Sequence, residues 1–75
     1  MSTATRLREA REAAGLSARG LCIRAGVSLG LAALIESGAK GMGHKSAHAF
    51  AEVLGVSSGW LLFGEGVKRP RKRAA

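Results

Sequence analysis

The chain has 75 residues, a formal net charge of +7 and one cysteine, and 47% of its residues are hydrophobic. A chain of this length forms one small domain at most and buries only about 60% of its unfolded surface. A single cysteine excludes an internal disulfide, and no apolar run reaches the roughly 18 residues of a membrane span, so we expect a soluble, cytoplasmic protein.

The positive charge is concentrated at the C-terminal end. Residues 67–75 contain five basic residues and no acidic one, whereas residues 1–66 contain seven basic and five acidic residues, a difference of +2. The net positive charge indicates an anionic partner. Because most of this charge lies in residues 67–75, we expect the tail to contribute most of the attraction to that partner. We expect a folded domain over residues 1–66 and a disordered basic tail over residues 67–75.

The first predicted helix runs from Thr3 or Ala4 to Ala14. Leu7, Ala10 and Ala14 are spaced to form its buried face, and Gly15 is expected to end it in a left-handed conformation.

A second helix follows, with Ser17 as its N-cap. Leu21 and Ala25 face inward, and Gly26 ends the helix. Cys22 is expected to be a core residue and not a redox or catalytic thiol, because no motif places a basic group beside it.

The same turn pattern occurs twice, at residues 25–28 (AGVS) and 54–57 (LGVS). In each, glycine can take a positive φ without steric cost, and valine can enter the core. The serine oxygen, in Ser28 or Ser57, is placed to accept an N–H of the next helix. The pattern predicts two tight helix-to-helix turns.

Three further helices are predicted over residues 29–37, 44–54 and 58–63, with Gly38 ending the first. The second has an apolar stripe at helical spacing, and the third supplies the bulky lid of the core. The inward residues of these last two helices are Ala47, Phe50, Ala51, Leu54, Trp60, Leu61 and Phe63. No strand is evident, so the predicted fold class is all-α.

Several short motifs occur in a distinctive order between Arg6 and Gly66. They are RLREAR at 6–11, GLS at 15–17, AGVS at 25–28, IESG at 35–38, LGVS at 54–57 and WLLFG at 60–64. In order and spacing the segment resembles the Cro and phage-repressor, or Xre-like, type of helix-turn-helix domain. The resemblance implies a compact, lambda-repressor-like five-helix bundle whose third helix enters the DNA major groove. It also implies an ion pair between Arg11 and Glu36.

The residues expected to touch DNA depart from the family pattern. Ala18 stands where the family commonly has glutamine, and the outer face of the third helix shows Gly30, Ala33 and Ser37 flanked by Leu29 and Leu34. Direct reading of bases relies on forked polar groups such as arginine, asparagine and glutamine, and this face has none. The candidate DNA-contacting residues are Ser17, Ala18, Arg19, Arg24, Ser28, Leu29, Gly30, Ala33, Leu34, Ser37, Lys40 and Lys45.

Three interpretations of this face remain open. Its leucines and alanine contact thymine methyl groups while neighbouring basic and hydroxyl residues hold phosphates. Alternatively, the domain binds DNA with little specificity, helped by a tail whose phosphate contacts are Lys68, Arg69, Arg71, Lys72 and Arg73. In the third interpretation, Leu29, Leu31 and Leu34 bind another protein.

The resemblance favours a DNA-binding transcription regulator of the repressor or switch type, of phage or bacterial origin, acting as a homodimer on double-stranded DNA. The alternative is a protein-interaction module on the same fold that regulates transcription through a protein partner. No catalytic set is evident, and no cofactor or metal is expected. His44 and His48 share a helix face but lack a third ligand nearby, so we interpret them as solvated side chains.

Overall fold

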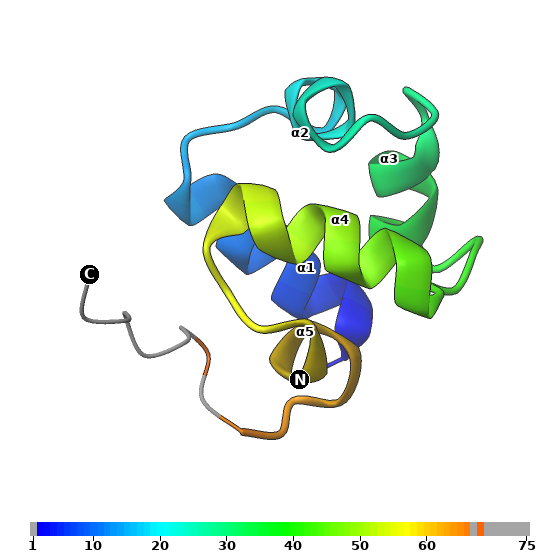
Figure 1. The fold of residues 1–75 in the computed structure, drawn as a ribbon. Helices are drawn as coiled ribbons and strands as arrows, with labels where there is room; N and C mark the ends of the chain where they lie inside the picture. Colours follow the sequence, from blue (N-terminus) through cyan, green and yellow to red (C-terminus); the bar gives the residue numbers. More distant parts are fainter. Residues whose placement is uncertain (1, 67, 69–75) are drawn as a thin grey trace, which may run out of the picture.

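The computed structural model describes residues 2–66 and 68, which fold into five α-helices with no β-strand (Figure 1). The helices are α1 (Thr3–Ala13), α2 (Ala18–Ala25), α3 (Leu31–Glu36), α4 (His44–Leu54) and α5 (Ser58–Phe63). Helix α4 contacts α2 and α5, while α1 contacts α3 and α5 on the other side of the core. The predicted all-α, five-helix fold is confirmed. Within the described residues, no helix combines the length and apolarity needed to cross a bilayer.

The core is built mainly from alanine, leucine and one large aromatic side chain. Phe50 of α4 lies at its centre and is fully buried. The other members of the core cluster are Leu7, Ala10, Leu21, Cys22, Ala32, Ile35, Ala51, Leu54, Val56 and Leu61. Buried Cys22 confirms the expectation of a core thiol. The inward faces predicted from helical spacing are therefore largely correct.

Two apolar residues expected in the core are exposed, so these predictions were wrong. Ala14 lies just after the end of α1, where the chain turns away through Gly15 at a φ of 72°. Phe63 is 61% exposed. At about 100° per helical residue, it lies roughly 200° from buried Leu61 and so points to the opposite side of α5. Its ring packs beside His44, with the ring centroids 6.3 Å apart.

The two glycine-valine turns have the same backbone geometry. Gly26 and Gly55 are left-handed, with φ of 72° and 68°. In each turn the valine N–H donates to a carbonyl in the preceding helix, from Val27 to Cys22 at 3.1 Å and from Val56 to Ala51 at 3.2 Å. The same two carbonyls also accept the N–H of the glycine, so each helix ends in a paired 5→1 and 6→1 hydrogen-bond arrangement. Both predicted turns are confirmed.

The serines that follow these turns behave differently. Ser57 caps α5, with its hydroxyl accepting the N–H of Trp60 at 3.0 Å, as predicted. Ser28 does not cap the next helix, because α3 begins only at Leu31, with Gly30 as an N-cap that has no side chain to bond. Instead, the backbone carbonyl of Ser28 accepts the N–H of Leu31 in a turn. The predicted 29–37 helix is thus shortened at both ends.

A buried arginine joins the start of the chain to its last helix. Arg6 is only 6% exposed, and its guanidinium donates to the carbonyls of Leu61 and Leu62, both at 3.0 Å. These carbonyls lie in the last turn of α5, where no intrahelical donor exists. Gly64 leaves room for this contact, because a Cβ there would lie 2.9 Å from the guanidinium. Arg6 therefore acts as a C-terminal cap for α5.

A second arginine joins α1 to the end of α3. The Arg11 guanidinium donates to both carboxylate oxygens of Glu36, at 2.7 and 2.9 Å, and to the carbonyl of Leu16 at 2.9 Å. Arg8 adds a contact of 3.3 Å to the same carboxylate. The ion pair implied by the family resemblance is thus present, and it fixes the helix-turn-helix against α1.

The pKa values of this pair are shifted in opposite directions. The hydrogen bond to Glu36 raises the pKa of Arg11. Burial raises the pKa of the Glu36 carboxyl, but the hydrogen bonds and charges of Arg11 and Arg8 outweigh it and lower that pKa below its ordinary value of 4.5. A carboxyl with a lower pKa in the folded state stabilises the fold fully above its unfolded-state pKa and loses this contribution as the pH falls through its folded pKa.

We therefore expect Glu36→Gln to lower the free energy of unfolding at neutral pH and to flatten the decrease of that free energy as the pH falls below about 5. Urea unfolding at several pH values measures both quantities. Glu52→Gln, which changes an exposed carboxylate on α4, is the matched control and should leave the pH dependence as it is. If Glu36→Gln lowered the free energy of unfolding equally at neutral and at acid pH, the lowered pKa of the Glu36 carboxyl would be contradicted.

Candidate nucleic-acid interface

Helices α2 and α3 are joined by a short turn and held together by a buried contact. The hydroxyl of Ser17 caps α2 by accepting the N–H of Gly20 at 2.9 Å. The backbone N–H of Ala32, in the first turn of α3, donates to the buried sulfur of Cys22 at 3.4 Å. Ala32 and Ile35 face the core, so the opposite side of α3 faces solvent. The arrangement is a helix-turn-helix with an exposed second helix.

The outward side of α3 is apolar, and we refer to Leu29, Ala33 and Leu34 as the α3 ridge. Both leucines are 47% exposed. The Ser37 hydroxyl at the end of the helix donates to the carbonyl of Leu34 at 3.0 Å and accepts the N–H of Ala39 at 3.4 Å. The hydrogen-bonding capacity of the Ser37 hydroxyl is therefore largely used within the protein. The surface that the ridge presents to a partner is apolar.

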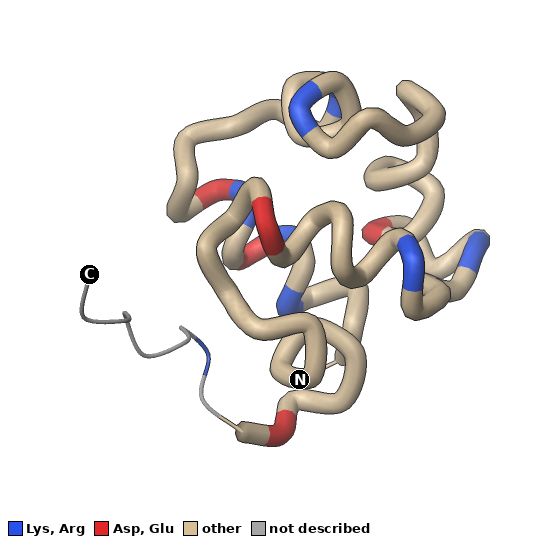
Figure 2. The backbone as a smooth tube through the Cα atoms, in the orientation of Figure 1, with Lys and Arg blue, Asp and Glu red and all other residues tan. Residues whose placement is uncertain are grey.

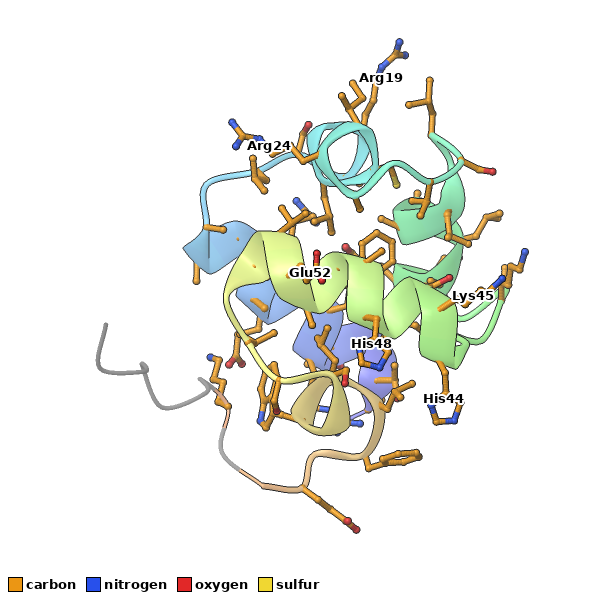
Figure 3. The ribbon with its side chains drawn as sticks, viewed as in Figure 1. Arg19, Arg24, His44, Lys45, His48 and Glu52 are labelled. Carbon is orange, nitrogen blue, oxygen red and sulfur yellow. The ribbon has the colours of Figure 1, made fainter. Side chains whose placement is uncertain are left out.

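Basic side chains stand on either side of this ridge. Figure 3 shows Arg19 pointing outward from α2 and Lys45 pointing outward from the first turn of α4. Lys40 is exposed in the loop between α3 and α4. Arg24 points to the other side of α2, away from Lys45 (Figure 3). Lys40 and Leu34 of the ridge line the same open hollow. Arg19 and Lys45 extend outward from the helices before and after α3, and Arg24 points in another direction.

The charges of the folded body are segregated (Figure 2). Between residues 17 and 46 the only acidic residue is Glu36, whose side chain is 6% exposed and paired with arginine. The exposed carboxylates lie elsewhere, on α1, on α4 and after α5, and they are Glu9, Glu12, Glu52 and Glu65. Residues 17–46 contain four basic residues and one acidic residue, a net charge of +3, whereas the whole body has a net charge of +2. We refer to the surface around these basic residues as the cationic side.

An open hollow of about 620 Å³ lies beside the ridge, between α3 and the loop that leads to α4. It is lined by Ser28, Gly30, Leu31, Leu34, Lys40, Gly41, Gly43 and Ser46. Its lining contains a lysine and no acidic residue, so the hollow extends the cationic side of the molecule.

Nearly all of the DNA-contacting residues predicted in the body are exposed. Ala18 differs, because it is half-buried and packs against the core. Leu31, predicted as part of a protein-binding set, is also half-buried against the core, so the exposed leucines of this region are Leu29 and Leu34. His44 and His48 are exposed on α4, and the described residues contain no group of three potential metal ligands.

Lys68, which we predict to contact phosphate, lies against the folded body in the structure. Its ammonium pairs with Glu9 at 3.1 Å and lies 4.9 Å above the ring of Trp60, while its carbonyl accepts the N–H of Ser57 at 2.8 Å. A nearby carboxylate and an aromatic face together hold this cation on the body. The other predicted tail contacts, Arg69, Arg71, Lys72 and Arg73, lie outside the described residues.

Sequence reasoning missed the bonds of Arg6 to the carbonyls of α5 and the pairing of Lys68 with Glu9, which join residues more than 50 positions apart. The signal for Arg6 was its place in the first family motif, which alone does not show that its partners are backbone carbonyls.

In the comparison with protein families, residues 4–59 match the model described as a helix-turn-helix domain. Neither the curated proteins nor the solved structures gave a match. The matched segment includes α1 to α4 and the start of α5, and so contains the ridge, the cationic residues around it and the Arg11–Glu36 pair. The chain belongs to the helix-turn-helix domain family, whose fold indicates a DNA-binding regulator.

Proposed function

We propose that this protein is a transcription regulator of the repressor or switch type, of phage or bacterial origin, that places α3 in the major groove of double-stranded DNA. The observation that carries the proposal is the charge segregation around α3. The cationic side coincides with the helix-turn-helix, whereas the exposed carboxylates lie on other elements. A duplex, with its dense negative charge, is the partner that this distribution favours.

In this proposal Arg19, Lys40 and Lys45 hold the phosphates on either side of the groove, and the α3 ridge lies against the base edges. Phosphate contacts set the position of the protein on the duplex, and base contacts set the sequence preference. The tail residues Arg69, Arg71, Lys72 and Arg73 add affinity through the release of counterions.

The proposed assembly is a homodimer on a site with twofold symmetry. Helix α3 has six residues, and its exposed side lacks the forked polar groups that give strong base contacts. One such helix holds DNA weakly, whereas two helices on half-sites one helical turn apart combine their contacts on one duplex.

The experiment compares two arginines of the same helix. We expect Arg19→Ala to weaken binding to a 30-base-pair duplex and to reduce the slope of log K against log salt by about 0.9 per protomer. Arg24→Ala is the matched control, because this exposed arginine points away from Lys45, and it should change the slope less. Fluorescence anisotropy at a series of salt concentrations measures both. Equal effects of the two substitutions would contradict the proposed placement of DNA.

A second candidate function is protein binding through the exposed pair Leu29 and Leu34, each 47% exposed. Large exposed apolar side chains that lie close together are typical anchors of protein interfaces. In that case Leu29→Ser and Leu34→Ser leave DNA binding unchanged and abolish binding of the protein partner.

A further inference from the structure

The chain lacks the side chains that usually read adenine. It contains no asparagine and no glutamine at any position. These amides form the paired hydrogen bonds by which proteins distinguish adenine in the major groove. The exposed side of α3 has no arginine or lysine to pair with guanine either, and its Ser37 hydroxyl is bonded to backbone groups. The base contacts that this helix itself can make are therefore mainly those of its carbon surface.

The major groove offers one apolar group on the base edges, the 5-methyl group of thymine. Cytosine presents a methyl group at the same ring position when it is methylated. On the α3 ridge, Leu29 and Leu34 stand out from the surface, while Ala33 and the exposed Gly30 are small. A Cβ added at Gly30 would meet no atom within 4 Å, so the surface there is open.

We propose that the α3 ridge reads pyrimidine 5-methyl groups in the major groove, so that the protein prefers thymine to uracil and 5-methylcytosine to cytosine. This inference rests on the proposed function. It requires a nucleic acid as occupant of the ridge, and the flanking cations supply the complementary charge. No exposed carboxylate lies between residues 17 and 46 to repel a phosphate backbone.

The test uses two pairs of alternating duplexes whose members differ only in a methyl group. The first pair is poly(dA-dT) and poly(dA-dU), and the second is poly(dG-5-methyl-dC) and poly(dG-dC). We expect the unchanged full chain to bind the methylated member of each pair about fourfold more tightly for every methyl group that the ridge buries. Two base-pair contexts are used so that the preference is tested for thymine and for 5-methylcytosine separately.

Substitutions then assign the effect to the ridge. Leu34→Ser and Leu29→Ser should each reduce the methyl preference, whereas Phe63→Ser should keep it, since Phe63 is an exposed apolar residue at the end of α5. Thermal unfolding shows which variants are folded, and the comparison of duplexes with the unchanged chain does not depend on any variant.

Equal binding of both members in each pair overturns methyl recognition and leaves the proposed function standing. A preference that survives in folded Leu34→Ser and Leu29→Ser also overturns it, because another surface then reads the methyl groups. Failure to bind any of the four duplexes at low salt overturns both the inference and the proposed function.

Discussion

Replacing Arg6 with alanine is expected to lower the free energy of unfolding by about 3 kcal/mol. The substitution removes the arginine donor to the Leu61 carbonyl and one of the two donors to the Leu62 carbonyl, which also accepts the Thr3 hydroxyl. An unsatisfied buried polar group costs about 1–3 kcal/mol. In a domain of this size such a loss lowers the melting temperature by about 15 °C. Chemical and thermal unfolding followed by circular dichroism measure the effect.

Arg8→Ala is the matched control for this prediction. Arg8 lies on the same helix, but its side chain is 55% exposed and makes a single contact of 3.3 Å to Glu36. Exposed ion pairs contribute about 0–1 kcal/mol, so the expected loss is small. Gly64→Ala should also lower the free energy of unfolding, because its Cβ would lie 2.9 Å from the Arg6 guanidinium and because Gly64 has a φ of 72°, which alanine rarely adopts. A loss below about 1 kcal/mol for Arg6→Ala would contradict its role as a cap.

The parts of the fold that follow from neighbouring residues could be predicted from the sequence. The two glycine-valine turns depend on bonds between residues five apart, from Val27 to Cys22 and from Val56 to Ala51. The buried faces depend on helical spacing, which correctly placed Phe50 in the core. It failed for Ala14, because the helix ends one residue before it, and for α3, because Ser28 and Gly30 form a turn instead of a first helical turn.

The candidate site was only partly predictable, because it depends on where distant segments meet. The outward position of Ala33 and Leu34 could be derived from their places around α3, whereas Leu29, which was predicted on the same helix, lies in the turn before it. The cationic side could not be derived in this way, because it appears only when α2 and the start of α4 lie on one part of the molecule and the exposed carboxylates on another. The contact of Lys68 with Glu9 likewise joins residues 59 positions apart, so no local pattern marks it.

The roles of the tail and of the helix-turn-helix body can be separated by the salt dependence of DNA binding. Each lysine or arginine that contacts a phosphate contributes about 0.9 to the slope of log K against log salt. The four tail substitutions Arg69→Ser, Arg71→Ser, Lys72→Ser and Arg73→Ser should therefore reduce the slope by up to about 3.6 per protomer. They retain Lys68, so its contacts with Glu9 and Trp60 are preserved.

The matched body variant changes Arg19, Lys40 and Lys45 to alanine and should reduce the slope by about 2.7 per protomer. Since the three residues are the proposed phosphate contacts of the helix-turn-helix, we expect this variant also to lose the methyl preference, whereas the tail variant keeps it. The reason is that phosphate contacts of the body fix the ridge in the groove, while tail contacts raise affinity for any duplex. If the tail variant binds no duplex at low salt and the body variant binds with an unchanged slope, the helix-turn-helix of this protein is not its DNA-binding surface.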